Sequence, residues 1–88
     1  MNAKGGYVYI VSNKYRTVFY IGVTSDLFNR AYEHKNAIGS SFTTKYKCTD
    51  LLYFEFFETI EEAIAREKLL KKWKRQWKID LIKKKILI

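Results

Sequence analysis

Two short runs of β-branched and aromatic residues, with a polar stretch between them, impose the strongest constraint on the fold of this chain. The runs cover residues 7–11 and 18–23, and both have the composition that favours β-strands. Residues 13–17 are suited to a turn, so the two strands are expected to close as an antiparallel hairpin. Alternation along the first strand places Tyr7 and Tyr9 on one face. Its other face carries Val8 and Ile10.

A helix is expected after this hairpin. Thr24, Ser25 and Asp26 offer N-cap side chains, and the pattern predicts a helix to about Ile38, where Gly39 fits the stop. Residues 39–49 are polar and indicate a connecting loop.

The second half of the chain begins with a third strand. Residues 51–57 are apolar enough to predict a central strand. Thr59 and Glu62 then form a capping box for a helix that continues to about Trp77. Residues 78–88 indicate a basic C-terminal helix or extended tail.

The element order β-β-α-β-α-α predicts an α+β fold, in which helices flank a small three-stranded antiparallel sheet. With 88 residues and no linker, residues 1–88 are expected to form a single domain, of which residues 1–5 are a loose N-terminus. The absence of a secretory signal or a long apolar run favours a cytoplasmic protein without a membrane span. Cys48 is the only cysteine, which excludes an internal disulfide.

The formal net charge of +8 favours a polyanionic partner, with nucleic acid first and an anionic membrane surface second. The cations concentrate beside Trp73 and Trp77, where indoles could stack on bases while cations neutralise phosphates. Packing of the tryptophans in the core, with a solvated basic face, is an interpretation at least as good. An interfacial helix on anionic lipid is the third and least favoured interpretation. The candidate nucleic-acid-binding residues are Lys71, Lys72, Lys74, Arg75 and Lys78.

Glu67 is the most unusual side chain of the second helix. It projects from the apolar arc of Ile60, Ala63, Ile64 and Leu70. A carboxylate there must be paired, neutral or bound to a metal ion, because burial of a bare charge is costly. A salt bridge to Lys71 at i,i+4 is the simpler alternative.

Four further side chains could act on a phosphodiester. Arg30 and His34 share a helix face at i,i+4, where both could reach one phosphate. The alternatives are an ion pair of Arg30 with Asp26 and a surface imidazole at His34. Tyr9 and Tyr20 could serve as bases if a nearby cation lowers their pKa, or could simply cover the core. Gly22 would let a backbone or a substrate approach closely.

The chain resembles the GIY-YIG nuclease domain. The resemblance is carried, in order along the chain, by Val8-Tyr9-Ile10, Tyr20-Ile21-Gly22, Arg30, His34 and the segment around Glu67. The chain is most similar to small stand-alone members, which are themselves similar to the N-terminal domain of the excinuclease C subunit. Tyr7 stands where the first motif of the family has glycine.

The resemblance implies an endonuclease that hydrolyses DNA with one divalent ion, Mg²⁺ or Mn²⁺, held by Glu67. It places Tyr9, Tyr20 and Arg30 around the scissile phosphate, with His34 in a catalytic or supporting position, and it suggests a role in DNA repair. A weakly active or inactive nucleic-acid-binding module on the same fold is the alternative hypothesis. A basic structural or lipid-associated protein comes third.

Overall fold

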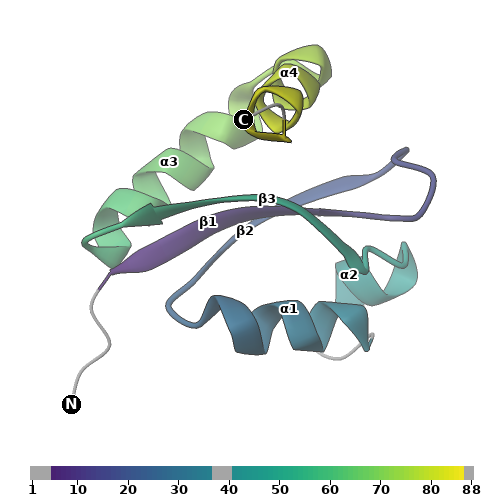
Figure 1. Ribbon diagram of the computed structural model, residues 1–88, viewed down its shortest axis with the longest axis horizontal. Coiled ribbons are helices and arrows are strands. Elements are labelled where there is room, and N and C mark those ends of the chain that lie inside the picture. The colour runs from purple at the N-terminus through teal and green to yellow at the C-terminus, as the bar shows by residue number, and fades with distance from the viewer. Residues whose placement is uncertain (1–4, 37–40, 87–88) are drawn as a thin grey trace.

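The computed structural model describes residues 5–36 and 41–86, and within them it contains three strands and four helices. Strands β1 (Gly6–Ser12), β2 (Phe19–Thr24) and β3 (Asp50–Phe57) form one antiparallel sheet in the order β2-β1-β3. Helices α1 and α2 lie on one face of this sheet, and α3 and α4 lie on the other (Figure 1). The α+β class, the β-β-α-β-α-α order and the antiparallel three-stranded sheet are confirmed, with α2 as a short additional helix.

Strand β1 is the centre of the sheet because it pairs with β2 on one side and with β3 on the other, and both of its faces are covered. All of its residues except Tyr7 are buried. The sequence-based placement of the third strand at the centre is therefore wrong. Strand β3 is an edge, and its outer positions remain open, with Phe56 54% exposed. An apolar run cannot by itself distinguish a strand covered on two faces from an edge strand that exposes aromatic side chains.

Helix α1 (Leu27–Lys35) begins as the sequence predicts. Asp26 is its N-cap, and the carboxylate of Asp26 accepts a hydrogen bond from the backbone N–H of Asn29. The expected helix end at Ile38 and Gly39 lies outside the described residues.

Helix α2 (Ser41–Lys45) lies in the stretch expected to be loop. It is a single short turn that ends with a reciprocal pair of backbone bonds, Cys48 N–H to the Thr43 carbonyl at 2.9 Å and Lys47 N–H to the Thr44 carbonyl at 3.3 Å. This is a Schellman cap, with Lys47 at the position that glycine usually occupies. Because glycine, the sequence signal of such a cap, is absent, the helix escapes prediction.

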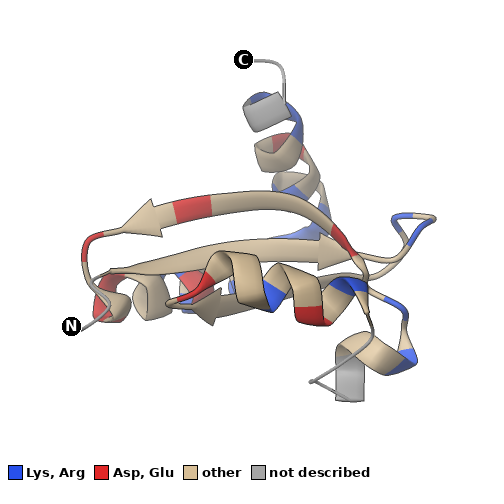
Figure 2. Ribbon diagram, turned by 60° about the horizontal axis from the view of Figure 1, so that its bottom comes forward, with Lys and Arg blue, Asp and Glu red and all other residues tan. Residues whose placement is uncertain are grey.

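Helix α3 (Ile60–Lys72) has the predicted capping box between Thr59 and Glu62. It ends earlier than expected, because Trp73 adopts an extended backbone conformation with ψ 150°. Helix α4 (Arg75–Ile86) then starts in a new direction (Figures 1 and 2). Trp73 packs against the core, and its ring centroid lies 5.3 Å from the guanidinium of Arg66. The helix therefore breaks at a residue held by tertiary contacts, and no glycine or proline in the sequence marks this position.

Alternation along β1 divides the core in two, as the sequence predicts. Val8 and Ile10 face α3 and α4 in the larger cluster, and Tyr9 and Val11 face the opposite side with Cys48. Among the residues of α3, Ala63 and Leu70 are fully buried, whereas Ile64 is 39% exposed. The apolar arc of α3 is thus narrower than the sequence suggests.

Within the described ranges, no helix combines the length and apolar character that a membrane span requires. The expected loose N-terminus falls mostly on residues 1–4, which lie outside the described residues. The C-terminal segment is helical to Ile86, so the helix alternative holds over the described part of that segment.

Two adjacent leucines of α3 test which face of this helix is buried in the core. Leu70 is 0% exposed and Leu69 is 49% exposed. We expect Leu70→Ala to lower the free energy of unfolding by about 3 kcal/mol, because it leaves a cavity in the larger cluster. Leu69→Ala should change this free energy by less than about 0.5 kcal/mol. Urea denaturation followed by circular dichroism measures both, and equal losses would contradict the assigned face.

Candidate active site

The Tyr9 side chain lies on the α1 side of the central strand, directly above a glycine of the neighbouring strand. Tyr9 pairs with Gly22 across β1 and β2. A Cβ at Gly22 would lie 2.5 Å from Tyr9 Cζ, closer than real side chains approach. Gly22 therefore makes room for the Tyr9 ring, which is only 2% exposed. The group that approaches Gly22 closely is this chain's own phenol, whereas the sequence suggested a backbone or a substrate.

His34 of α1 contacts this phenol. Its Nε2 lies 3.0 Å from the Tyr9 hydroxyl, and the two ring centroids are 5.4 Å apart. His34 is only 3% exposed, so the alternative of a surface imidazole is wrong. The other ring nitrogen, Nδ1, is buried and has no hydrogen-bond partner among the residues that the structure describes.

Tyr20 and Arg30 complete the cluster. The Tyr20 ring centroid lies 6.0 Å from that of His34. Arg30 lies near enough to the Tyr9 hydroxyl to favour its ionised form, and Arg30 Nε lies 3.2 Å from Glu33 Oε1. The ion pair of Arg30 is thus with Glu33 at i,i+3, whereas the sequence suggested Asp26. Four of the predicted site residues converge at the face of the sheet that α1 covers.

Burial determines the protonation of the central pair. Burial, and then the neighbouring Tyr20, raise the pKa of Tyr9 from its ordinary 10.0 to about 12, although Arg30 opposes this shift. Burial, followed by the positive charge of Arg30, lowers the pKa of His34 below its ordinary 6.5. Both side chains are therefore neutral at pH 7. The pKa of Tyr9 is therefore raised, and not lowered as a phenolate base at this position would need.

Glu67 lies apart from this cluster, on α3, which packs on the other face of the sheet (Figure 1). It sits between the buried Ala63 and Leu70 along the helix, and its side chain is 18% exposed. Its carboxylate is paired, since Oε2 lies 3.0 Å from Lys71 Nζ. Across the described ranges, no group of three or more His, Cys, Asp or Glu side chains is arranged to hold a metal ion.

The basic residues predicted to bind nucleic acid lie at the junction of α3 and α4. Two of them have structural contacts, Lys71 with Glu67 and Arg75 with the Phe19 ring at 4.4 Å. Lys74 lies 5.7 Å from the ring of Trp77, and Lys72 is exposed. Lys78 is half-buried.

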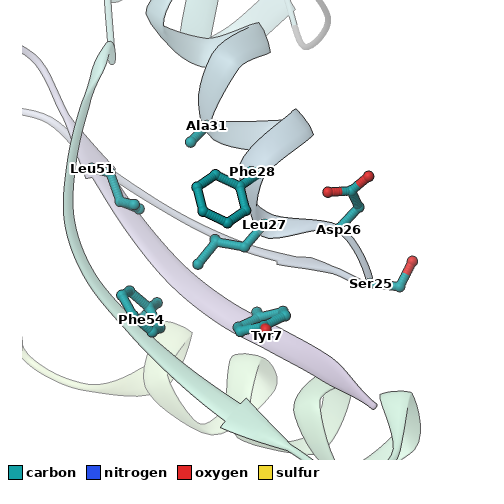
Figure 3. A pocket seen from close by; sticks show the side chains of 8 residues that line it. All are labelled: Tyr7, Ser25, Asp26, Leu27, Phe28, Ala31, Leu51 and Phe54. Carbon is teal, nitrogen blue, oxygen red and sulfur yellow. The ribbon is translucent and has the colours of Figure 1, made fainter. Parts of the chain in front are cut away.

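An apolar recess of about 420 Å³ lies near the N-terminal turn of α1. Figure 3 shows Leu27 and Phe28 of α1, Tyr7 of β1 and Phe54 of β3 around it. Phe28 is 92% exposed, an unusual placement for a phenylalanine. The sequence analysis did not single out this recess, because its residues are spread over three elements.

Residues 5–80 match the family described as the GIY-YIG catalytic domain, and the chain belongs to this family. Family membership supports a nuclease-type function with nucleic acid as substrate, and nucleases of this family generally depend on a divalent metal.

The chain is similar to several small bacterial proteins over most of its length. It is 40% identical to the UPF0213 protein CPE1444 of Clostridium perfringens, over 90% of this chain and 84% of that protein. It is 37% identical to the UPF0213 protein SSP2268 of Staphylococcus saprophyticus, over 86% of this chain and 92% of that protein. A UPF0213 protein of Staphylococcus aureus is 34% identical, over 90% and 95% of the two chains. No solved structure matches the chain.

Two contributions to the cluster were missed by the sequence analysis. Glu33 was not considered, although its i,i+3 spacing from Arg30 is a usable signal for an ion pair. The hydrogen bond between Tyr9 and His34 joins residues 25 positions apart, so no local sequence pattern predicts it.

The lowered pKa of His34 predicts how stability depends on pH. The unfolded chain binds a proton at His34 near pH 6.5, whereas the folded chain does not until lower pH. The contribution of His34 to stability is therefore present above this value and is lost as pH falls below it. We expect the melting temperature of the wild type to fall between pH 7 and pH 5.5, and that of His34→Gln to change less. His34 is the only histidine, so parallel slopes in the two proteins would contradict its burial as a neutral group.

Proposed function

We propose that this protein is an endonuclease that hydrolyses DNA phosphodiester bonds with the help of one divalent ion, Mg²⁺ or Mn²⁺. The observation that carries the proposal is the convergence of Tyr9, Tyr20, Arg30 and His34 around one buried hydrogen bond. A cytoplasmic setting and a role in DNA repair stay predictions.

Tyr9 and His34 act together as a proton relay in this proposal. The relay uses the tautomer of neutral His34 in which Nε2 accepts a hydrogen bond from the Tyr9 hydroxyl, 3.0 Å away. As water attacks phosphorus, its proton passes to the Tyr9 oxygen while the phenolic proton passes to Nε2. The phenol therefore never needs to exist as a free phenolate, which its pKa of about 12 disfavours. His34 is buried and reaches the phosphate only through Tyr9, so it is a positioning and proton-accepting group.

Arg30 is the candidate for stabilising the charge that develops on the phosphoryl oxygens. Its side chain is 43% exposed, which leaves it accessible to a substrate. Glu33 holds its Nε and thereby limits the orientations of the guanidinium. Donors fixed before the reaction stabilise a transition state more than mobile donors do. Tyr20, beside His34, would hydrogen-bond the attacking water or the phosphate.

Glu67 is the candidate ligand of the divalent ion. Its hard carboxylate oxygen suits Mg²⁺ or Mn²⁺, and the carboxylate already has a cationic neighbour in the Lys71 ammonium, 3.0 Å away. Because Mg²⁺ retains several waters and binds substrate oxygens, a single carboxylate is a sufficient protein ligand. Once bound, such an ion would polarise the phosphoryl group and assist the leaving oxygen.

The edge strand β2 offers a way to bring the two sides together. Helix α3 packs mainly against β1 and β2, and β2 has no further strand beyond it. A phosphate at this edge would be approached by Arg30 from the α1 side and by Glu67 from the α3 side. The sugar and bases would then extend toward the basic junction of α3 and α4, where Lys72, Lys74 and Lys78 offer phosphate contacts. On the opposite side, the recess beside Phe28 offers a stacking surface for a base.

Substitutions at the two charged residues test the cleavage reaction. We expect Glu67→Gln and Arg30→Ala each to reduce cleavage of DNA in Mg²⁺ by about 100-fold or more, because each removes charge stabilisation from the transition state. Glu61→Gln is the matched control, an exposed carboxylate in the first turn of the same helix, and it should cleave like the wild type. Cleavage is measured with labelled oligonucleotides that are single-stranded, nicked or branched. Activity that survives both substitutions would rule out the assigned residues.

The relay makes a separate prediction about pH. Tyr9→Phe removes the phenol and should lower the rate by about 100-fold to 10,000-fold. In the wild type the rate should fall as pH drops below the pKa of His34, because a protonated Nε2 cannot accept the phenolic proton. His34→Gln should be slower and should lose this acidic limb. A pH–rate profile with the same acidic limb in His34→Gln would exclude the relay.

A nucleic-acid-binding module with little turnover is the second candidate function. The altered first motif favours it, since Tyr7 stands in place of the glycine that the family has there. This candidate requires salt-sensitive DNA binding that survives Glu67→Gln, together with no metal-dependent cleavage of any substrate tested.

A further inference from the structure

The end of the molecule beyond the active-site cluster carries a second group of cations and aromatic rings. Residues 13–15 of the β1–β2 turn line a cavity of about 580 Å³ together with Thr44 of α2 and with Tyr46, Lys47 and Thr49, which follow α2. Among its lining residues are Lys14, Tyr15, Tyr46 and Lys47. Figure 2 shows that Lys and Arg segments gather at the hairpin tip and beside α2. We call this surface, defined by these four residues and Lys45, the basic end.

The cations of the basic end are not used by the fold. Lys14 and Lys45 lie over aromatic rings, 5.7 Å from the centroid of Tyr15 and 5.4 Å from that of Tyr46. No ion pair involves Lys14, Lys45 or Lys47 in the part of the chain that the structure describes. The rings beneath these ammonium groups are accessible, with Tyr15 75% exposed. Positive charge alternating with exposed phenol faces is the pattern expected for contacts with phosphates and bases or sugars.

The backbone of Lys47 provides an independent observation. Its φ is 56°, in the left-handed region, because it closes the Schellman cap of α2. Glycine adopts this conformation without strain, and lysine does not. The only other described non-glycine residue with positive φ is Arg16, whose guanidinium is used by an ion pair to Asp50 at 2.7 Å. Among the residues that the structure describes, Lys47 makes no ion pair, so the cap fixes its backbone while its ammonium stays available for a contact outside this chain.

The basic end is connected to the active-site cluster through the core. Cys48, next to Lys47, is fully buried in the same cluster as Tyr9 and Val11. The segment that presents Lys47 is therefore fixed relative to Tyr9 by packing. A substrate strand held by this segment would have its position defined relative to the catalytic groups.

We propose that the basic end binds the sugar-phosphate backbone of the substrate at a distance from the scissile phosphate. Lys14 and Lys47 would contact phosphates, and Tyr15 would pack against a base or sugar. This inference rests on the proposed function for the identity of the substrate, and it assigns a second contact region that the sequence analysis did not identify.

Lys47→Gly gives a test in which stability and binding change in opposite directions. Glycine relieves the left-handed backbone, so the melting temperature should rise by about 4 °C. The substitution also removes the ammonium, so the dissociation constant for a labelled oligonucleotide should increase several-fold, measured by fluorescence anisotropy. Lys47→Arg keeps the charge and should bind like the wild type. A variant that is more stable and binds equally well would overturn the proposal.

Salt dependence identifies the phosphate contacts. The double variant Lys14→Gln/Lys47→Gln should reduce the slope of log affinity against log salt by about 2, close to one per phosphate contact. The control Lys83→Gln/Lys84→Gln has the same net charge, and it changes two exposed lysines of α4. Equal effects in the two double variants would mean that only total charge matters, and would overturn the proposal. Binding without cleavage would end the proposed nuclease function alone, whereas the absence of any binding would end both.

Discussion

Burial of both faces of β1 is the constraint on which the rest of this structure depends. Val8 and Ile10 anchor the layer of α3 and α4, while Tyr9 and Val11 anchor the side of α1 and Cys48. In a chain of 88 residues there is one modest core, and a single strand serves as the wall between its two halves. Since neighbouring residues of a strand point to opposite faces, the same seven residues that hold the sheet together also bring Tyr9 to α1.

The hydrogen bond between Tyr9 and His34 is the chemical consequence of that arrangement. Gly22 leaves space for the phenol, and the low exposure of both partners keeps them neutral at pH 7. At Tyr9, burial raises the pKa of the phenol more than the positive charge of Arg30 lowers it. A pair of this kind suits coupled proton movement, in which neither group has to carry an isolated charge in the resting protein. The raised pKa of Tyr9 thus argues against a preformed tyrosinate at this position.

Charge elsewhere on the molecule is divided between structural and available groups. Arg66 binds Glu55 through two nitrogens, at 2.9 and 3.0 Å, and Arg16 joins the hairpin turn to Asp50. These pairs fasten α3 and the hairpin to β3. By contrast, the lysines of the basic end make no ion pair among the described residues, so their charges remain available to a partner. This division is what a polyanion-binding protein requires.

The sequence by itself determined the local features, because each depends on residues close together in the chain. These are the hairpin, the facing of Tyr9 away from Val8, the Asp26 cap and the capping box of Thr59 and Glu62. Its ordered motifs also pointed to the family. Only the tertiary structure decided that β3 lies at an edge, that α2 forms, that the helix breaks at Trp73 and that His34 is buried against Tyr9. Each of these features depends on contacts between residues that are far apart in the sequence. The periodicity of apolar residues along the chain does not show which distant residues those contacts involve.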